Sequence, residues 1–326
     1  MKLSGTWARV VGAAVCVACS GAAVAQSGNP DFSVPDDSKQ TPATKQPEKS
    51  KPAREEGRQG LVDLRAKFRE GMKATFKMVM ENKNDLAGGE PGKPEQIVKQ
   101  EIGLTLRVKS VSADGAAALE LVYDSLKFDM QSDALDVSFD SSKPADKQDE
   151  FADMLKTIVG TTLTMQADAN GNITSVSGGG PTSMPGIPGD VSQQFTGGDV
   201  IKNFFGPITT LQSGSGRVSV GESWTNEDTV AGGMGNFRIK NTYTLRSYRA
   251  PTAQVDMNGT MSLDGSSTGP VDLREGTIKG RYVWDTEEGM LKSMEMTMRT
   301  VVNTKLTGDN NPTESRSEST VSVTRK

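Results

Sequence analysis

The chain has 326 residues, a formal net charge of −4 and no histidine. A sequence pI near 5.2 argues against general nucleic-acid binding. The lack of histidine excludes Ser-His-Asp and Cys-His catalysis and imidazole metal sites. Cys16 and Cys19 are the only cysteines, so the chain after them has no thiol nucleophile, disulfide or Cys-ligated zinc. The 35 glycines and the aromatic content of only 5% favour strands and turns over a helical bundle.

Residues 1–25 have the pattern of a secretory signal peptide. Lys2 and Arg9 supply a positive start, residues 10–18 form a short apolar run, and Ala25 ends a small-x-small cleavage site. The apolar run is too short to span a membrane, and no later stretch is long and apolar enough to do so. These features predict export to the periplasm or the extracellular space. The alternative is a lipid anchor on Cys19, because the residues before it resemble a bacterial lipobox.

Residues 26–60 are rich in Ser, Pro, Lys, Gln, Asp and Glu and poor in large apolar side chains. Such a segment cannot bury enough apolar surface to offset the entropy of ordering it, so we expect a disordered polar linker. Residues 61–326 are expected to form a single β-rich domain. Within it, residues 61–177 and 217–326 have similar strand-and-turn patterns, which indicate two pseudo-repeats within one curved sheet. A Gly/Pro-rich loop and a short helix join them.

Alternating apolar residues predict antiparallel strands in both parts of the domain. Residues 61–80 fit either a helix or strands, but Gly71 indicates a turn and favours two strands. Residues 104–108 alternate cleanly, and Asp114-Gly115 is a hairpin signal before the return strand. On that return strand the apolar register shifts by one residue. The shift predicts a β-bulge near Asp124 and Ser125, which would curve the sheet.

Residues 149–159 have apolar side chains at helical spacing, on one stripe of the helix surface. Gly160 is placed to end this helix. A second short apolar helix is predicted near residues 200–208. The fold class is therefore mainly β (α+β): a curved antiparallel half-barrel or open barrel with one or two short helices on its concave face. The stripe consists of Phe151, Met154, Leu155, Ile158 and Val159.

Three short motifs support a resemblance to known proteins. They are Leu-Arg-x-Lys-Phe-x-x-Gly at residues 64–71, Val-Ser-Ala-Asp-Gly at 111–115 and Val-Gly-Glu-Ser-Trp at 220–224. Together with the signal and the polar spacer, they resemble a family of exported bacterial proteins of unknown function, over most of residues 61–325. The family provides no catalytic residues to transfer. The layout also resembles the half-barrel of periplasmic lipoprotein carriers, which implies a curved sheet covered by helices and able to hold acyl chains.

Several apolar side chains are candidates for contact with a ligand on the concave face. A row of methionines on one face of a predicted strand fits ordinary core packing, an adaptable lining for an apolar ligand, or thioether ligands of Cu(I). Trp284 fits a core anchor or a cavity rim. The candidate ligand-facing residues are Phe151, Leu155, Ile158, Phe204, Phe205, Trp284, Met294, Met296 and Met298.

Paired carboxylates are the main indication of an enzyme, since two converging acids could perform acid and base catalysis. Their positions in turns or on polar strand faces favour solvated surface charge. The stretch at residues 168–171 lacks the closing Glu of a calcium loop, and the glycines at 178–180 lack the Lys of a phosphate loop. The three carboxylate pairs are Asp124 with Asp129, Asp136 with Asp140, and Glu287 with Glu288.

The leading hypothesis is an exported, non-enzymatic binding or carrier module for a hydrophobic, lipid-like ligand. No cofactor, metal, catalytic residue, nucleic-acid partner or integral membrane span is expected. The second hypothesis is a structural or protein-interaction domain of the cell envelope. The third is a hydrolase that uses a carboxylate pair.

Overall fold

A computed structural model describes residues 60–85, 95–132, 135–143, 150–178, 205–211, 216–232, 235–263, 271–304 and 313–326. Several predicted features lie outside these residues. They are the signal peptide with Ala25 and Cys19, almost all of the polar linker, most of the Gly/Pro loop, and Phe204. The export predictions therefore stay predictions. No helix in the described ranges is both long and apolar enough to cross a membrane.

Twelve strands form one large antiparallel sheet, and two short strands, β1 and β8, form a second. The order across the large sheet is β7-β6-β4-β3-β2-β14-β13-β12-β11-β10-β9, with β5 also paired to β4. The strands are β1 (Val62–Asp63), β2 (Lys73–Asp85), β3 (Gln96–Val111), β4 (Ala117–Ser132), β5 (Leu135–Asp140), β6 (Thr162–Ala167), β7 (Ile173–Gly178), β8 (Arg217–Val218), β9 (Ser223–Gly232), β10 (Gly235–Arg249), β11 (Thr252–Leu263), β12 (Val271–Asp285), β13 (Met290–Thr304) and β14 (Thr313–Arg325).

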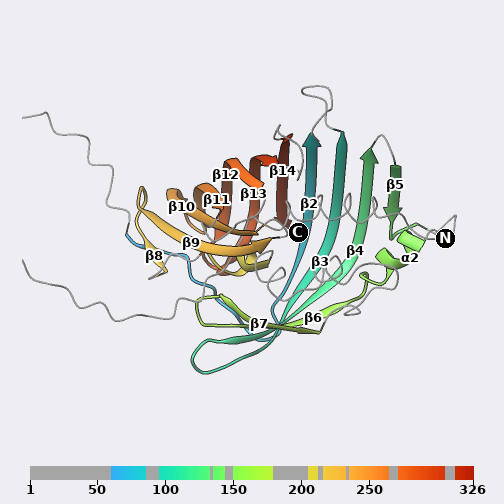
Figure 1. The fold of residues 1–326 in the computed structure, drawn as a ribbon. Coiled ribbons are helices and arrows are strands. Elements are labelled where there is room, and N and C mark those ends of the chain that lie inside the picture. The colour runs from blue at the N-terminus through green and yellow to red at the C-terminus, as the bar shows by residue number, and fades with distance from the viewer. Residues whose placement is uncertain are drawn as a thin grey trace, which may run out of the picture.

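The large sheet consists of two up-and-down arrays that meet at one strand pair. Strands β2 to β7 form the first array and β9 to β14 form the second, and antiparallel pairing of β2 with β14 joins them. Among the described strands, β7 and β9 end the strand order and do not pair with each other, so no closed barrel forms, and β5 is a further edge strand beside β4. The sheet curls into an open trough whose inner side faces the viewer in Figure 1. An open, curved, mainly β fold is thus confirmed.

The predicted β-bulge is confirmed at the centre of β4. Gly103 pairs with Ser125 and Leu104 with Tyr123, which leaves Asp124 as the extra residue. Asp124 accepts a hydrogen bond of 2.6 Å from the hydroxyl of Thr105. The bulge explains why the apolar side chains change phase there and still face one side of the sheet.

The strands near the seam are longer than the apolar alternation predicts. β2 continues to Asp85 and β3 begins at Gln96, whereas the alternation ends at Met80 and restarts at Leu104. The added residues include Asn82, Asn84 and Gln96, all of them buried. Alternation of hydrophobicity cannot detect a strand whose buried face becomes polar.

The predicted helix at residues 149–159 is shorter and lies elsewhere than expected. α2 spans Glu150–Lys156, and turns follow up to Gly160, which has a positive φ of 83°. β5 and β6 pair with successive parts of the same edge of β4, and α2 connects them. The helix therefore lies at the edge of the sheet rather than across its concave face, because hydrogen bonds from both flanking segments to β4 hold it there.

The second predicted helix is present in part. Residues 205–209 are helical, and Phe205 and Ile208 are buried in the core. The segment lies inside the trough in Figure 1, as the sequence predicted for the concave side.

Leu155 is 2% exposed and belongs to the main core, so we expect Leu155→Ala to lower the free energy of unfolding by about 2–5 kcal/mol. Urea denaturation measures this. Lys156→Ala is the matched control, because its side chain is 44% exposed and should cost no more than about 0.5 kcal/mol. Equal small losses from both variants would show that the helix does not contribute to the core.

Candidate ligand-binding face

Strand register aligns the inner-facing side chains into rows that cross the trough. The first row lies in the lower half of the sheet, where β2 begins. All of its members are apolar or aromatic, and none is more than 8% exposed. Row one consists of Leu245, Val255, Tyr282, Met294, Val323, Met78, Ile102 and Leu126.

The second row lies one pleat higher and is rich in sulfur and aromatic rings. Gly280 separates the side chains of Met257 and Met296, and a methyl group added to it would lie 3.0 Å from Cε of Met257. Thioethers adapt to irregular shapes, so this row can pack against apolar groups of varied outline. Row two consists of Trp224, Tyr243, Met257, Gly280, Met296, Val321, Met80, Gln100, Phe128 and Phe139.

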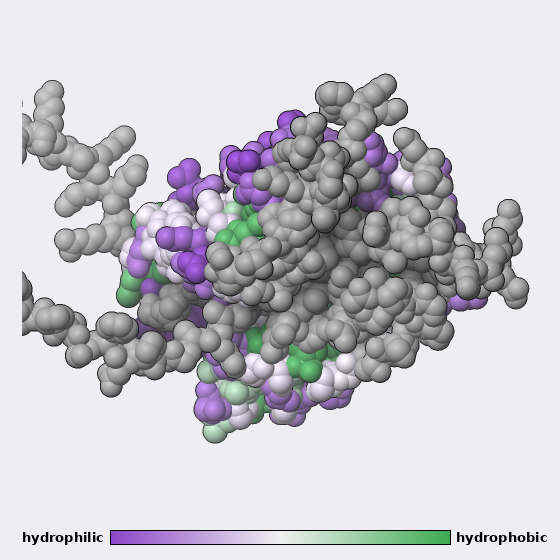
Figure 2. All heavy atoms as spheres, in the orientation of Figure 1, coloured by the Kyte–Doolittle hydropathy of each residue, from purple (hydrophilic) through white to green (hydrophobic). Residues whose placement is uncertain are grey.

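The two rows above are progressively more polar. In Figure 2 hydrophilic residues gather along the upper margin, and hydrophobic residues are visible lower down. Row three consists of Asn226, Asn241, Gly259, Ile278, Met298, Ser319, Asn82, Val98, Met130 and Val137. Row four includes Asp228, Ile239, Met261, Gly276, Thr300, Ser317, Asn84, Gln96 and Ser132.

Row four contains a chain of hydrogen bonds across three strands. The hydroxyl of Ser317 donates to Oδ1 of Asn84 at 2.7 Å, and Nδ2 of Asn84 donates to Oε1 of Gln96 at 3.1 Å. Nε2 of Gln96 lies 3.6 Å from the sulfur of Met130. These polar side chains satisfy one another. Asn82 and Ser319 in row three differ, because among the described residues neither side chain has a hydrogen-bond partner.

Three segments contact one another at the lower end of the trough, and we call them the plug: residues 60–72, 168–172 and 205–211. Phe205 packs edge-on against Tyr123 of β4, with ring centroids 6.3 Å apart. Leu211 accepts a 3.0 Å hydrogen bond from the indole of Trp224 on β9. The third segment therefore contacts two strands that lie far apart in the sheet.

An ion-pair network joins β14 to the turn between β12 and β13, and a plug residue forms a hydrogen bond to that turn. Arg325 pairs with Asp285 at 2.8 Å and also with Glu288, and the Arg325 and Asp285 side chains are each 13% exposed. Burial alone would raise the pKa of Asp285, but the backbone N–H of Glu288 and the Arg325 guanidinium outweigh it and lower that pKa. Lys67 of the plug donates to the Thr286 carbonyl at 2.6 Å.

An aromatic cluster lines the trough between β9 and β12. The rings of Trp224 and Tyr243 stack at 5.6 Å, and Tyr243 tilts against Tyr282 at 5.9 Å. Burial raises the pKa of both phenols, so each stays a neutral donor. The Tyr282 hydroxyl donates to the sulfur of Met257 at 3.5 Å.

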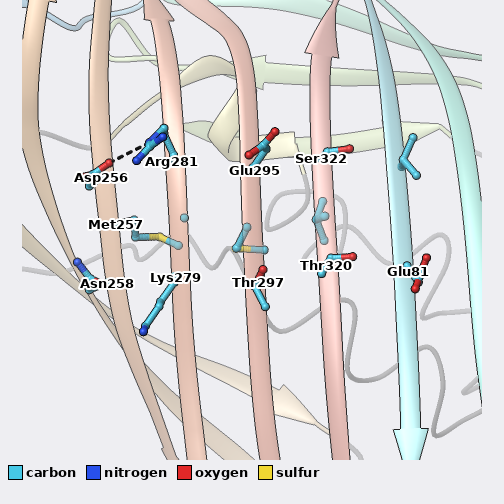
Figure 3. A pocket seen from close by; sticks show the side chains of 14 residues that line it. Glu81, Asp256, Met257, Asn258, Lys279, Arg281, Glu295, Thr297, Thr320 and Ser322 are labelled. Atoms are coloured by element: carbon cyan, nitrogen blue, oxygen red, sulfur yellow. Dashed lines mark hydrogen bonds and ion pairs between the residues drawn. The ribbon is translucent and has the colours of Figure 1, made fainter. Parts of the chain in front are cut away.

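The outer face of the same strands is polar and charged. It has a hollow of about 660 Å³ over β11–β14 and β2 (Figure 3). Asp256 pairs there with Arg281 at 3.3 Å and with Arg246 at 2.9 Å. Figure 3 shows Lys279 and Thr297 on neighbouring strands. Such a face is typical of the solvated side of an antiparallel sheet.

The structure separates the predicted ligand-facing residues into three places. Met294, Met296 and Met298 follow one another up the inner face of β13, in rows one, two and three. Phe205 is in the plug and Trp284, which is 0% exposed, lies at the lower end of the sheet near it. Leu155 and the half-buried Ile158 lie at the β4 edge. The side chain of Phe151 is outside the described part. Their role in binding stays a prediction.

Sequence reasoning missed the polar residues of rows three and four. A signal was nevertheless present, because Asn82 and Asn84 continue the two-residue spacing of Met78 and Met80. In the same way, Ser317 and Ser319 continue the spacing of Val321 and Val323.

Four of the six acids in the predicted carboxylate pairs bond to other residues. Hydrogen bonds from the side chain and backbone of Ser142 lower the pKa of Asp140, which keeps it ionised rather than available as a general acid. No group of three or more Cys, Asp or Glu residues in the described ranges could hold a metal ion. Other contacts of these acids are Asp124 with Thr105, Asp129 with Ser138, and Glu288 with Arg325.

The chain belongs to the family of unknown function DUF6263, whose model matches residues 114–184 and 189–311. This confirms membership of an uncharacterised family. A search of curated protein sequences finds no match.

Among solved structures, the chain is similar to lipovitellin, from a study of lipid–protein interactions, at 14% identity and a TM-score of 0.47. The match covers 80% of this chain and 25% of the lipovitellin chain, so this chain spans a quarter of its length. It is also similar to Rv2717c from M. tuberculosis, at 8% identity and a TM-score of 0.19, over 77% of this chain and 91% of that one. Likenesses this loose carry no information about ligands.

The close approach within the plug can be tested at Gly171, where φ is +89° and a methyl group would collide with the Thr209 carbonyl and Ala66. Gly71 is a matched control, because its φ is +78° and a methyl group there meets nothing within 4 Å. Gly71→Ala should cost about 1 kcal/mol of unfolding free energy from backbone strain. Gly171→Ala should cost clearly more by the same denaturation assay. Equal costs would contradict the described packing.

The plug should also lose stability in acid through Asp63. Its side-chain hydrogen bond with Arg65 lowers the pKa of Asp63 from 3.8 to about 2. Because the folded pKa is depressed, the contribution is complete above 3.8 and is lost as the pH falls towards 2. The difference in unfolding free energy between wild type and Arg65→Met should shrink over that interval. A difference that stays constant would contradict the assignment.

Proposed function

We propose that the protein is an exported, non-enzymatic binding or carrier module for a hydrophobic, lipid-like ligand, and that rows one and two hold the ligand's apolar part. The observation that carries this proposal is the continuity of row one. Eight strands present only apolar or aromatic side chains at one level of the trough. Neighbouring strands are about 4.8 Å apart, so the row provides a long apolar strip.

Two features of the trough support the proposal. Its methionines, Met78, Met80, Met257, Met294 and Met296, lie in rows one and two and can adapt to alkyl chains of different shape. The plug occupies the lower end, so a ligand on these rows would have its remaining part directed towards the upper rim. The engaged carboxylates described above favour binding over hydrolysis.

A second candidate function is protein interaction in the cell envelope. The observation that favours it is the set of open sheet edges, because among the described strands β5, β7 and β9 each have one unpaired side. An open edge can accept a strand from a partner. Both candidates assume export, which fractionation of the native cells would test.

Native mass spectrometry of the full chain purified from its own envelope fraction tests the leading proposal. We expect an added mass that organic extraction removes and that is identified as a hydrophobic small molecule. Recovery of a stable protein complex without any small molecule would instead favour the interaction function.

A double variant locates the binding surface. Met80→Gln with Met296→Gln introduces two polar amides of similar volume into row two, and should weaken binding of an apolar fluorescent probe at least tenfold. Val79→Gln is the control, because Val79 lies on the same strand as Met80, faces outward and is 36% exposed. Binding is compared at a temperature where circular dichroism shows all three proteins folded. Unchanged binding in the double variant would place the ligand elsewhere.

A further inference from the structure

We propose that the ligand is an amphiphile with an uncharged, hydrogen-bonding head group, and that Asn82 and Ser319 bind this head while rows one and two hold the tail. This inference rests on the proposed function and specifies the chemistry of its ligand. It depends on the position, burial and hydrogen bonding of these two side chains, and on the placement of charge around them.

Asn82 and Ser319 face each other across the seam between β2 and β14. They are direct register partners, and they are 1% and 2% exposed. Their neighbours in row three are Val98 and Met298, which are also buried. Met80 and Val321 lie one pleat below them. The pair is therefore the first polar position above the apolar rows on these two strands.

Both side chains have unused hydrogen-bonding capacity. Oδ1 and Nδ2 of Asn82 and Oγ of Ser319 make no hydrogen bond within the described part of the chain. A buried polar group without a partner is costly, and it is rare in folded proteins. The neighbouring Asn84, Gln96 and Ser317 do not compete for these groups, because they bond to each other. Two donor atoms, Nδ2 and Oγ, and two acceptor atoms, Oδ1 and Oγ, match a hydroxyl, ester or amide group of a ligand.

The absence of charge around the pair determines the kind of head group. On β2, β3, β4, β13 and β14, the described members of rows two to four include no ionisable side chain. Asp228, on the distant edge strand β9, is the ionisable member of row four. The charged neighbours in sequence, Glu81, Lys83 and Glu318, alternate to the outer face. A carboxylate or phosphate head would thus be desolvated without a counter-ion, which is strongly unfavourable.

Competition against a fluorescent apolar probe on the full-length chain tests the inference. The competitors are 1-monooleoylglycerol, which has a neutral head group, oleate, which has an anionic one, and octadecane, which has none. We expect monooleoylglycerol to compete about tenfold or more better than the other two, since each additional hydrogen bond contributes roughly five- to tenfold in affinity. Equal competition by all three would overturn the inference but leave the proposed function standing. No competition by any of them would overturn both.

Substitutions then assign the preference to the pair. Asn82→Leu and Ser319→Ala should each reduce the affinity for monooleoylglycerol about five- to tenfold and leave that for octadecane unchanged. Asn258→Leu and Ser322→Ala are matched controls, because they make the same changes on the outer face of the sheet.

The melting temperature of the unliganded variants separates binding from structure. Replacing unpartnered polar groups by apolar ones of similar size should maintain or raise it. If an ordered water alone satisfied the pair, Ser319→Ala would lower the melting temperature without changing the preference for monooleoylglycerol. That result would overturn the inference. The test with Ser319→Ala can be made even if Asn82→Leu fails to fold.

Discussion

The pairing of β2 with β14 is the interaction on which the rest of the structure depends. It joins the first long strand of the domain to the last, over ten consecutive residue pairs from Arg316 with Asp85 to Arg325 with Phe76. Without it there would be two separate antiparallel arrays, each with an additional open edge. With it, the inner faces of both arrays become one surface, and every row crosses the seam. Pairing between strands so far apart in sequence is slow to form, because the long loop between them must be closed.

The seam also explains why one surface contains both apolar and polar rows. At its lower end, Arg325 of β14 pairs with Asp285 at the end of β12. Near its upper end, Asn84 and Ser317, 233 residues apart, form a hydrogen bond to each other. Charges are concentrated on the outer face, which meets water. The inner face can therefore change from apolar to polar along the strands without including ionised groups near the seam.

Local patterns predicted the elements well where one face was uniformly apolar. The bulge at Asp124 and the hairpin at Gly115 follow from local signals, and the structure contains both. The helix ends at Lys156, before the predicted stop at Gly160. The position of the helix was wrong, because hydrogen bonds from its flanking segments to β4 decided it. The upper halves of β2, β3 and β14 were missed, because their buried side chains are polar. The same feature that obscured the strands forms the candidate head-group site.

The sequence by itself determined which residues form strands in the apolar half, where the chain turns, and that no histidine or thiol chemistry is available to the domain. It also placed Met294, Met296 and Met298 on one face, because alternation along a strand is a local property. Only the tertiary structure decided which strand lies beside which. It brought Asn82 opposite Ser319 and placed both above the methionine rows. The reason is physical: cross-strand neighbours are set by register between distant segments, and neither segment alone specifies its partner.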